Sequence, residues 1–201
     1  MLGSEEETPV AKTIKGSKTE QNLLKAFAGE SQARNRYTFF ASEARKAGFE
    51  QIAAIFEETA ANEKEHAKVF FKHLEGGDLE ITATYPAGAT KDTRANLAAA
   101  AAGEKAEWGT IYPDFAKVAR TEGFPEVASS FEQIGKAEAF HEMRYNRLGA
   151  SIDKGEVFKK KASVKWHCIN CGYIAEGVEA PKICPACKHP QAFYEVLAEN
   201  W

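Results

Sequence analysis

A Glu-x-x-His spacing occurs twice in the chain, at residues 63–66 and 138–141. On an α-helix, positions i and i+3 lie on the same face, so each pair directs a carboxylate and an imidazole the same way. Upstream of each pair, a single glutamate follows a glycine, at Glu30 and at Glu104. In helical bundles, two single glutamates and two such pairs hold two metal ions between the helices. The sequence therefore predicts a helical bundle with a dinuclear metal site.

These residues also fall at one height of the predicted bundle. Glu30 lies 18 residues before Gly48, the expected turn between the first two helices, and the first pair begins 15 residues after that glycine. Around Gly123 the second half repeats this spacing to within one residue. Since a helix rises about 1.5 Å per residue, the positions match in height. We therefore expect six ligands to converge: Glu30, Glu63, His66, Glu104, Glu138 and His141. Carboxylates combined with imidazoles favour iron or manganese.

The predicted fold is mainly α-helical, a ferritin-like four-helix bundle over residues 17–150 with helices at 17–47, 49–75, 92–122 and 125–149. Residues 76–91 contain glycine and proline and are expected to form a connection. Sixteen extended residues reach roughly 50 Å, whereas a helix of 27 residues is roughly 40 Å long. The connection can therefore cross the whole bundle and leave the second and third helices parallel, as in one-crossover bundles.

The two halves of the predicted bundle are related in sequence. Residues 44–49 (ARKAGF) and 119–124 (ARTEGF) match with an offset of 75, as do Tyr37 and Tyr112. The offset between the two single glutamates is 74, so one extra residue enters the second half before Tyr112. In a regular helix this residue would rotate everything after it by about 100°. A π-helical turn absorbs such an insertion and often marks a functional site. Glu107 lies in this window, so we predict a π-helical turn there and a seventh candidate ligand, Glu107, opposite His66.

The composition excludes several classes of function. The formal net charge of −3 provides no basic surface for nucleic acid. The longest apolar run, 97–102, is too short to span a membrane. Residues 1–16 include three consecutive glutamates where a signal peptide would be apolar, so we expect a mobile N-terminal tail and a cytoplasmic protein.

All four cysteines lie in the last 34 residues, as two C-x-x-C pairs with 12 residues between them. In a reducing compartment such pairs indicate a metal site and not disulfides. Four thiolates suit a tetrahedral ion, and the pattern alone leaves iron and structural zinc open. We expect a linker at 151–163 and then a small β/knuckle domain at 164–201, with the ligands Cys168, Cys171, Cys184 and Cys187.

Together, these motifs closely resemble the rubrerythrin family over residues 14–201. The resemblance rests on FAGESQARNRY at 27–37, EKEH at 63–66, LEGGDL at 74–79, EAFH at 138–141 and CINCGY at 168–173. It implies a ferritin-like di-iron bundle, followed by a rubredoxin-like domain with one iron. It also implies a peroxidase that reduces hydrogen peroxide to water in oxidative-stress protection. Electrons would come from NAD(P)H through a separate oxidoreductase or a rubredoxin, and the cysteine site of one chain would serve the bundle of the other in a homodimer.

The resemblance also implies a role for each site residue. It implies that Glu63 and Glu138 are bridging carboxylates and that Glu30 is a terminal ligand of the first iron. Glu104 and His141 would be ligands of the second iron, and Glu107 and His66 alternative ligands of the first. Tyr37 and Tyr112 would form hydrogen bonds beside the site. A second hypothesis is a ferroxidase that handles iron as ferritins do. Zinc in the cysteine site would favour that second hypothesis, because zinc cannot relay electrons.

Overall fold

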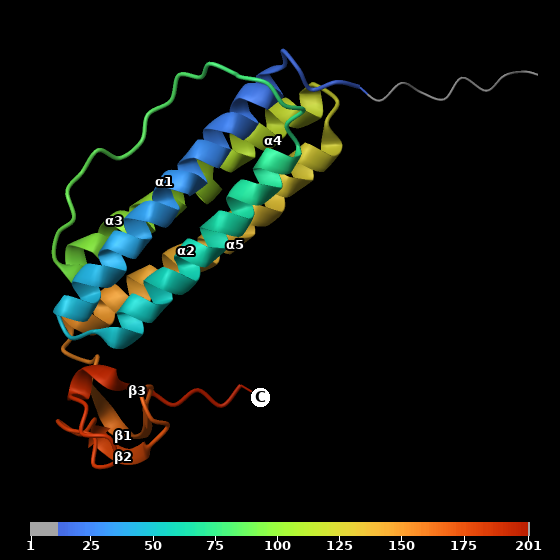
Figure 1. Cartoon of the computed structure of the whole chain (residues 1–201). Helices are drawn as coiled ribbons and strands as arrows, with labels where there is room; N and C mark the ends of the chain where they lie inside the picture. The colour runs from blue at the N-terminus through green and yellow to red at the C-terminus, as the bar shows by residue number, and fades with distance from the viewer. Residues whose placement is uncertain (1–11, 201) are drawn as a thin grey trace, which may run out of the picture.

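The computed structural model describes residues 12–200, so residues 1–11 of the expected N-terminal tail lie outside it. Long helices form a bundle, and a small β domain follows at the C-terminal end (Figure 1). The helical elements are α1 (Lys18–Lys46), α2 (Glu50–Lys72), α3 (Thr93–Ala106), the π-helical turn η1 (Glu107–Ile111), α4 (Tyr112–Thr121) and α5 (Pro125–Asp153). Because α3, η1 and α4 follow one another without a break, they form one long helix of the bundle. The predicted mainly α-helical fold class is confirmed.

The hairpin turns at Gly48 and Gly123 are nearly identical, as the sequence repeat predicts. Both glycines have φ of +79°, a left-handed conformation that glycine adopts without strain. After each turn, the amide N–H of the next phenylalanine donates to a carbonyl five residues earlier, at 2.9 Å and 2.8 Å. This bond closes the C-terminal end of the preceding helix. The same ion pair, Arg45–Glu57 in one half and Arg120–Glu132 in the other, braces each hairpin.

The connection after α2 runs along the outside of the bundle, and α3 begins at the opposite end (Figure 1). Thus α2 and α3 run in the same direction, and the predicted single crossover is confirmed. The side-chain oxygen of Asp92 accepts a hydrogen bond from the Ala95 amide at 2.8 Å, which caps the first turn of α3.

The π-helical turn predicted from the offset of 74 against 75 is present as η1, at Glu107–Ile111. It widens the helix by the one inserted residue. Glu104 and Tyr112, on either side of it, are both buried, at 1% exposure. The turn therefore keeps both flanks of the long helix facing the core.

The core of the bundle consists of two apolar clusters that lie at different heights. On α1, Ala26 belongs to one cluster and Ala33 to the other. On α5, Ile134 and Tyr145 divide between the clusters in the same way. The level between them is where the predicted metal ligands fall along these helices.

Three segments differ from those predicted: the last helix, the linker and the N-terminal tail. Helix α5 was expected to end at Gly149 but continues to Asp153. A Cβ added to Gly149 would lie only 3.2 Å from the Arg94 guanidinium, so a larger residue would be crowded at this position. Strand β1 begins at Lys159, so the segment between the helix and the sheet is 154–158 and not 151–163. Residues 12–16 of the expected tail contact the bundle, since Ile14 is buried and its amide donates to Glu75 at 2.8 Å.

The C-terminal domain is a three-stranded antiparallel sheet in the order β2-β1-β3. Its strands are β1 (Lys159–Cys168), β2 (Ile174–Glu179) and β3 (Tyr194–Val196), with a short 3-10 helix η2 (Gln191–Phe193) before β3. Trp166 and Tyr194 are fully buried in its small core. Phe158 stacks on Phe49 of the bundle, with ring centroids 6.1 Å apart.

The hairpin turn at Gly48 allows a test of the fold. Gly48→Ala should lower the free energy of unfolding by about 1 to 2 kcal/mol, because a side chain is strained at this positive φ. Gly109→Ala in η1 is the control, since nothing lies within 4 Å of an added Cβ there and φ is not positive. Urea unfolding compares the two variants. Equal loss of stability in both would contradict the assignment of strain to Gly48.

Candidate metal centres

Four carboxylates and two imidazoles from four helical segments meet between the two apolar clusters. Their side-chain atoms form two overlapping groups, each within 4.8 Å. The groups are Glu30, Glu63, His66 and Glu138, and Glu63, Glu104, Glu138 and His141. The predicted convergence of these six residues at one height of the bundle is thus observed.

Glu63 and Glu138 belong to both groups, and each directs one oxygen toward each imidazole. The His66 Nδ1 atom lies 2.9 Å from Glu63 Oε2 and 2.9 Å from Glu138 Oε1. The His141 Nδ1 atom lies 3.2 Å from Glu63 Oε1 and 2.8 Å from Glu138 Oε2. This arrangement suits two cations that share both carboxylates. Glu30 completes the group around His66, and Glu104 the group around His141.

The residues of this cluster fit metal ions because their buried oxygens lack hydrogen-bond partners. The exposure of the four carboxylates is 1% or less. Oxygen atoms without a hydrogen-bond partner occur on all four, including both oxygens of Glu138. Burial of an anion is costly unless the anion is paired or binds a metal, so this cluster is suited to binding cations.

Two buried tyrosines link the single glutamates across the two halves of the bundle. The Tyr37 hydroxyl of α1 donates to Glu104 Oε1, and the Tyr112 hydroxyl of α4 donates to Glu30 Oε1. Each tyrosine thus satisfies the outer oxygen of a glutamate from the other half and leaves its second oxygen free. The hydrogen bonding expected of these tyrosines is observed.

Without metal, the cluster shifts the pKa values of its members. Burial, followed by the charges of Glu138 and Glu63, raises the pKa of Glu30 well above its usual value. Burial also raises the pKa of Glu104 to about 8. For His66, burial acts to lower the pKa, but close contacts with the carboxylates of Glu138 and Glu63 outweigh it and raise the pKa to about 9. The metal-free cluster therefore binds protons where cations would otherwise sit.

Glu107, the predicted seventh ligand, lies beside the cluster but in neither group. Its side chain is partly buried, and its pKa is raised well above its usual value by burial and then by the nearby charge of Glu104. Arg36 of α1 opposes this rise. Sequence reasoning did not single out Arg36, although its spacing from Gly29 and Gln32 places all three on one face of α1. Its Nε–H donates to Gln32 Oε1 at 2.7 Å.

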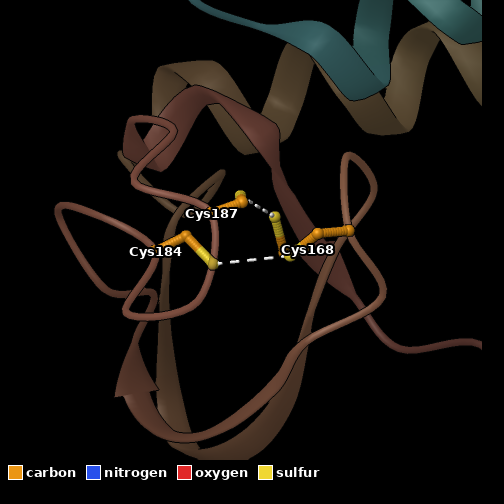
Figure 2. Close-up of side chains that lie close together, drawn as sticks. Cys168, Cys184 and Cys187 are labelled. Carbon is orange, nitrogen blue, oxygen red and sulfur yellow. Dashed lines mark hydrogen bonds between the residues drawn. The ribbon is translucent and has the colours of Figure 1, made fainter.

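The four cysteines converge in the C-terminal domain, where Cys184 and Cys187 face Cys168 (Figure 2). The sulfur atoms of Cys168 and Cys187 are 3.8 Å apart, and those of Cys171 and Cys184 are 3.7 Å apart. Four sulfurs bonded to one tetrahedral metal ion at about 2.3 Å would be separated by about 3.8 Å. The thiols are free, and their spacing fits a metal ion and is too long for disulfides.

Within residues 12–200, each helix is too short or too polar to cross a membrane.

Comparisons with known proteins agree with both sites. The family described as Rubrerythrin matches residues 21–149, and the family described as "Rubrerythrin, rubredoxin-like domain" matches residues 166–195. A rubrerythrin of Porphyromonas gingivalis is 57% identical over 200 residues, which cover 100% of both chains. A rubrerythrin of Nitratidesulfovibrio vulgaris is 56% identical over 190 residues, which cover 94% of this chain and 100% of that relative. A solved mixed-valence state of nigerythrin is 34% identical with a TM-score of 0.62, covering 94% of this chain and 91% of the other. These matches support a di-iron ferritin-like site and a rubredoxin-like domain.

Replacing one shared carboxylate should abolish binding of the metal pair. In Glu63→Ala, two cations would face each other with less negative charge between them, and their repulsion would rise. Metal analysis after iron loading should give at most one iron in the bundle. Glu65→Ala is the matched control on the same helix, because Glu65 is exposed and pairs with Lys68. Two irons bound in Glu63→Ala would rule out the shared role.

The metal-free protein should lose stability as the pH rises from about 5 to 9. The folded-state pKa values of Glu104, about 8, and His66, about 9, lie above their ordinary values of 4.5 and 6.5. Each therefore contributes stability that is present below its ordinary pKa and is lost as the pH rises through the folded value. Melting temperatures of the metal-free protein across this range provide the test. A melting temperature that is constant or rising between pH 6 and 9 would contradict it.

Proposed function

The chain belongs to the rubrerythrin family, and on this premise we propose that it reduces hydrogen peroxide to water at the dinuclear site of the bundle. Membership makes it an oxidative-stress iron protein with di-iron and rubredoxin-like domains. The observation that carries the proposal is the sharing of Glu63 and Glu138 between the two imidazoles. Two adjacent redox-active cations match the two-electron demand of a peroxide bond.

The reaction is H₂O₂ + 2 e⁻ + 2 H⁺ → 2 H₂O. Two ferrous ions, when bound, would supply both electrons. Glu63 and Glu138 would hold the two ions together, with Glu30 and His66 on one ion and Glu104 and His141 on the other. The hydroxyls of Tyr37 and Tyr112 donate hydrogen bonds to Glu104 and Glu30, which fixes the orientation of these carboxylates. The two apolar clusters pack the helices on either side of this level.

Glu107 and His66 are proposed as alternative ligands of one ion. His66 belongs to a ligand group in this structure, and Glu107 lies outside both groups. A neutral imidazole suits a ferrous ion, whereas an additional carboxylate suits the more highly charged ferric ion. The position of His66 within a ligand group supports this imidazole as one of the two alternatives. The π-helical turn at Glu107 places this carboxylate beside the cluster, where the first half of the bundle offers no equivalent.

Electrons are proposed to enter through iron in the four-cysteine site, from a rubredoxin or an NAD(P)H-dependent oxidoreductase. Within one chain, the C-terminal domain lies at the end of the bundle that contains Gly48. A Cβ added to Gly48 would lie 3.7 Å from Ala192 of that domain. His66 is 18 residues further along the bundle, which is roughly 27 Å of helix. Electron tunnelling over that length is slow, so we propose a homodimer in which a second chain brings its cysteine site closer. Exposed aromatic side chains on the bundle, Phe39, Phe71 and Phe140, provide apolar surface for such contacts.

The division of labour between the two sites allows a direct test of the proposal. Cys171→Ser removes one thiolate of the C-terminal site and should abolish peroxide turnover driven by NADH and a donor oxidoreductase. The same iron-loaded variant, reduced chemically with dithionite, should still consume one equivalent of peroxide per bundle site. If the reduced wild-type bundle does not react with peroxide, the proposed function is wrong.

The same experiment distinguishes the alternative ferroxidase function. A ferroxidase would oxidise added ferrous iron with oxygen over many turnovers and would accumulate ferric iron. It would be indifferent to Cys171→Ser, because storage of iron needs no electron relay. Faster oxidation by oxygen than by peroxide in the reduced wild type, with iron accumulation, would favour it over the peroxidase.

A further inference from the structure

A cavity of about 550 Å³ lies between the long helices and the crossover connection, on the Glu107 side of the metal cluster. Its walls come from α1, from the α3-η1-α4 helix and from residues 82–86 of the connection. Glu107 and Tyr112 both line it and both lie next to the cluster. The cavity therefore extends from the outer connection to the side of the dinuclear site where Glu107 stands.

The Tyr85 ring stands in this cavity close to Glu107. A Cβ added to Gly29 would lie 3.7 Å from the Tyr85 ring and 4.0 Å from Glu107 Oε1. The ring and the carboxylate thus approach the same point on α1, and the missing side chain of Gly29 leaves room for both. Glu30, a member of the metal cluster, follows Gly29 directly, so the Tyr85 ring lines the cavity beside the part of α1 that carries this ligand.

Tyr85 is also the point at which the connection is held to the bundle. Within residues 80–91, all of which the structure describes, Ile81 and Tyr85 are partly buried and the others are exposed. The Tyr85 hydroxyl donates to the Lys25 carbonyl of α1 at 2.7 Å. Among the described residues, this is the hydrogen bond that ties segment 78–90 to a helix. The Tyr85 side chain thus holds this segment against α1, with its ring partly buried and its hydroxyl bonded to the helix backbone.

We propose that this cavity is the route by which peroxide reaches the dinuclear site, and that the Tyr85 ring limits the size of the peroxide that passes. The inference rests on the proposed peroxidase function and deepens it. Hydrogen peroxide is small enough to pass beside the ring, whereas an alkyl hydroperoxide carries a bulky group that the ring blocks. Reduction of the alkyl substrate would use the same two electrons and two protons, ROOH + 2 e⁻ + 2 H⁺ → ROH + H₂O. The two peroxides therefore differ in whether they can reach the dinuclear site, and not in the chemistry of their reduction.

The test compares full-length, iron-loaded wild type with Tyr85→Ala, Tyr85→Phe and Ile81→Ala. Each protein is reduced with dithionite and mixed with hydrogen peroxide or with tert-butyl hydroperoxide, and oxidation is followed by absorbance. Tyr85→Ala should speed the reaction with tert-butyl hydroperoxide by about tenfold or more, the lower end of what a pocket achieves by size discrimination. Its rate with hydrogen peroxide should change little. Tyr85→Phe keeps the ring and should keep the discrimination, as should Ile81→Ala, which alters the same connection outside the cavity lining.

Binding of anions without turnover gives a second readout. Absorbance changes of the oxidised proteins report the association of azide, which is small, and of benzoate, which is bulky. Benzoate should associate faster with Tyr85→Ala than with wild type, and azide equally fast with both. If Tyr85→Ala fails to fold, Tyr85→Leu replaces it, because leucine is smaller and keeps an apolar contact with α1.

The proposal is overturned if removing the ring leaves the rates with both bulky probes unchanged, or if Ile81→Ala raises them as much as Tyr85→Ala does. Its failure is distinct from failure of the proposed function. A reduced wild type that does not react with hydrogen peroxide would refute the peroxidase. The azide and benzoate measurements would still decide whether Tyr85 controls access to the site.

Discussion

The burial of four carboxylates at one height of the bundle is the constraint on which the rest of the structure depends. Taking one such charge out of water costs several kcal/mol, and here four lie within one cluster. Without cations, the folded chain has to keep protons on groups such as Glu30 and Glu104, whose pKa values are raised. Metal binding and folding are therefore linked, and loading the site releases protons. The two apolar clusters stabilise the helices on either side of this level.

Most of the bundle and of its site could be predicted because the relevant information is local and periodic. The i, i+3 spacing fixes which side chains share a face, and distances from Gly48 and Gly123 fix their height. Even the π-helical turn follows from counting one residue more between Glu104 and Tyr112. These features need only the geometry of a helix.

The positions that the sequence did not predict depend on contacts between distant segments. Gly149 was expected to end the last helix, but it lies four residues before the end of α5, where the close approach of the Arg94 side chain leaves room only for glycine. Tyr85 sits in a segment without periodicity, and its place above Gly29 follows only from the path of the connection. The Ile14 amide donates a hydrogen bond to Glu75, just after the end of α2, and no local sequence pattern predicts this contact. The ligand spacing likewise favours iron or manganese without choosing the metal, which the family comparison supplies.

The inserted residue in η1 has a consequence for how such a site arises. Two copies of one helical hairpin, associated as separate chains, would place every substitution in both halves at once. When both copies belong to one chain, a change can occur in a single half. Here the inserted residue and Glu107 are both found in the second half only. In the proposed ligand exchange, the metal position beside His66 would have Glu107 as a second partner, whereas the position beside His141 would have no such alternative. Two related hairpins in one chain can thus differ at a single position, so the two halves of a nearly symmetric site need not be equivalent.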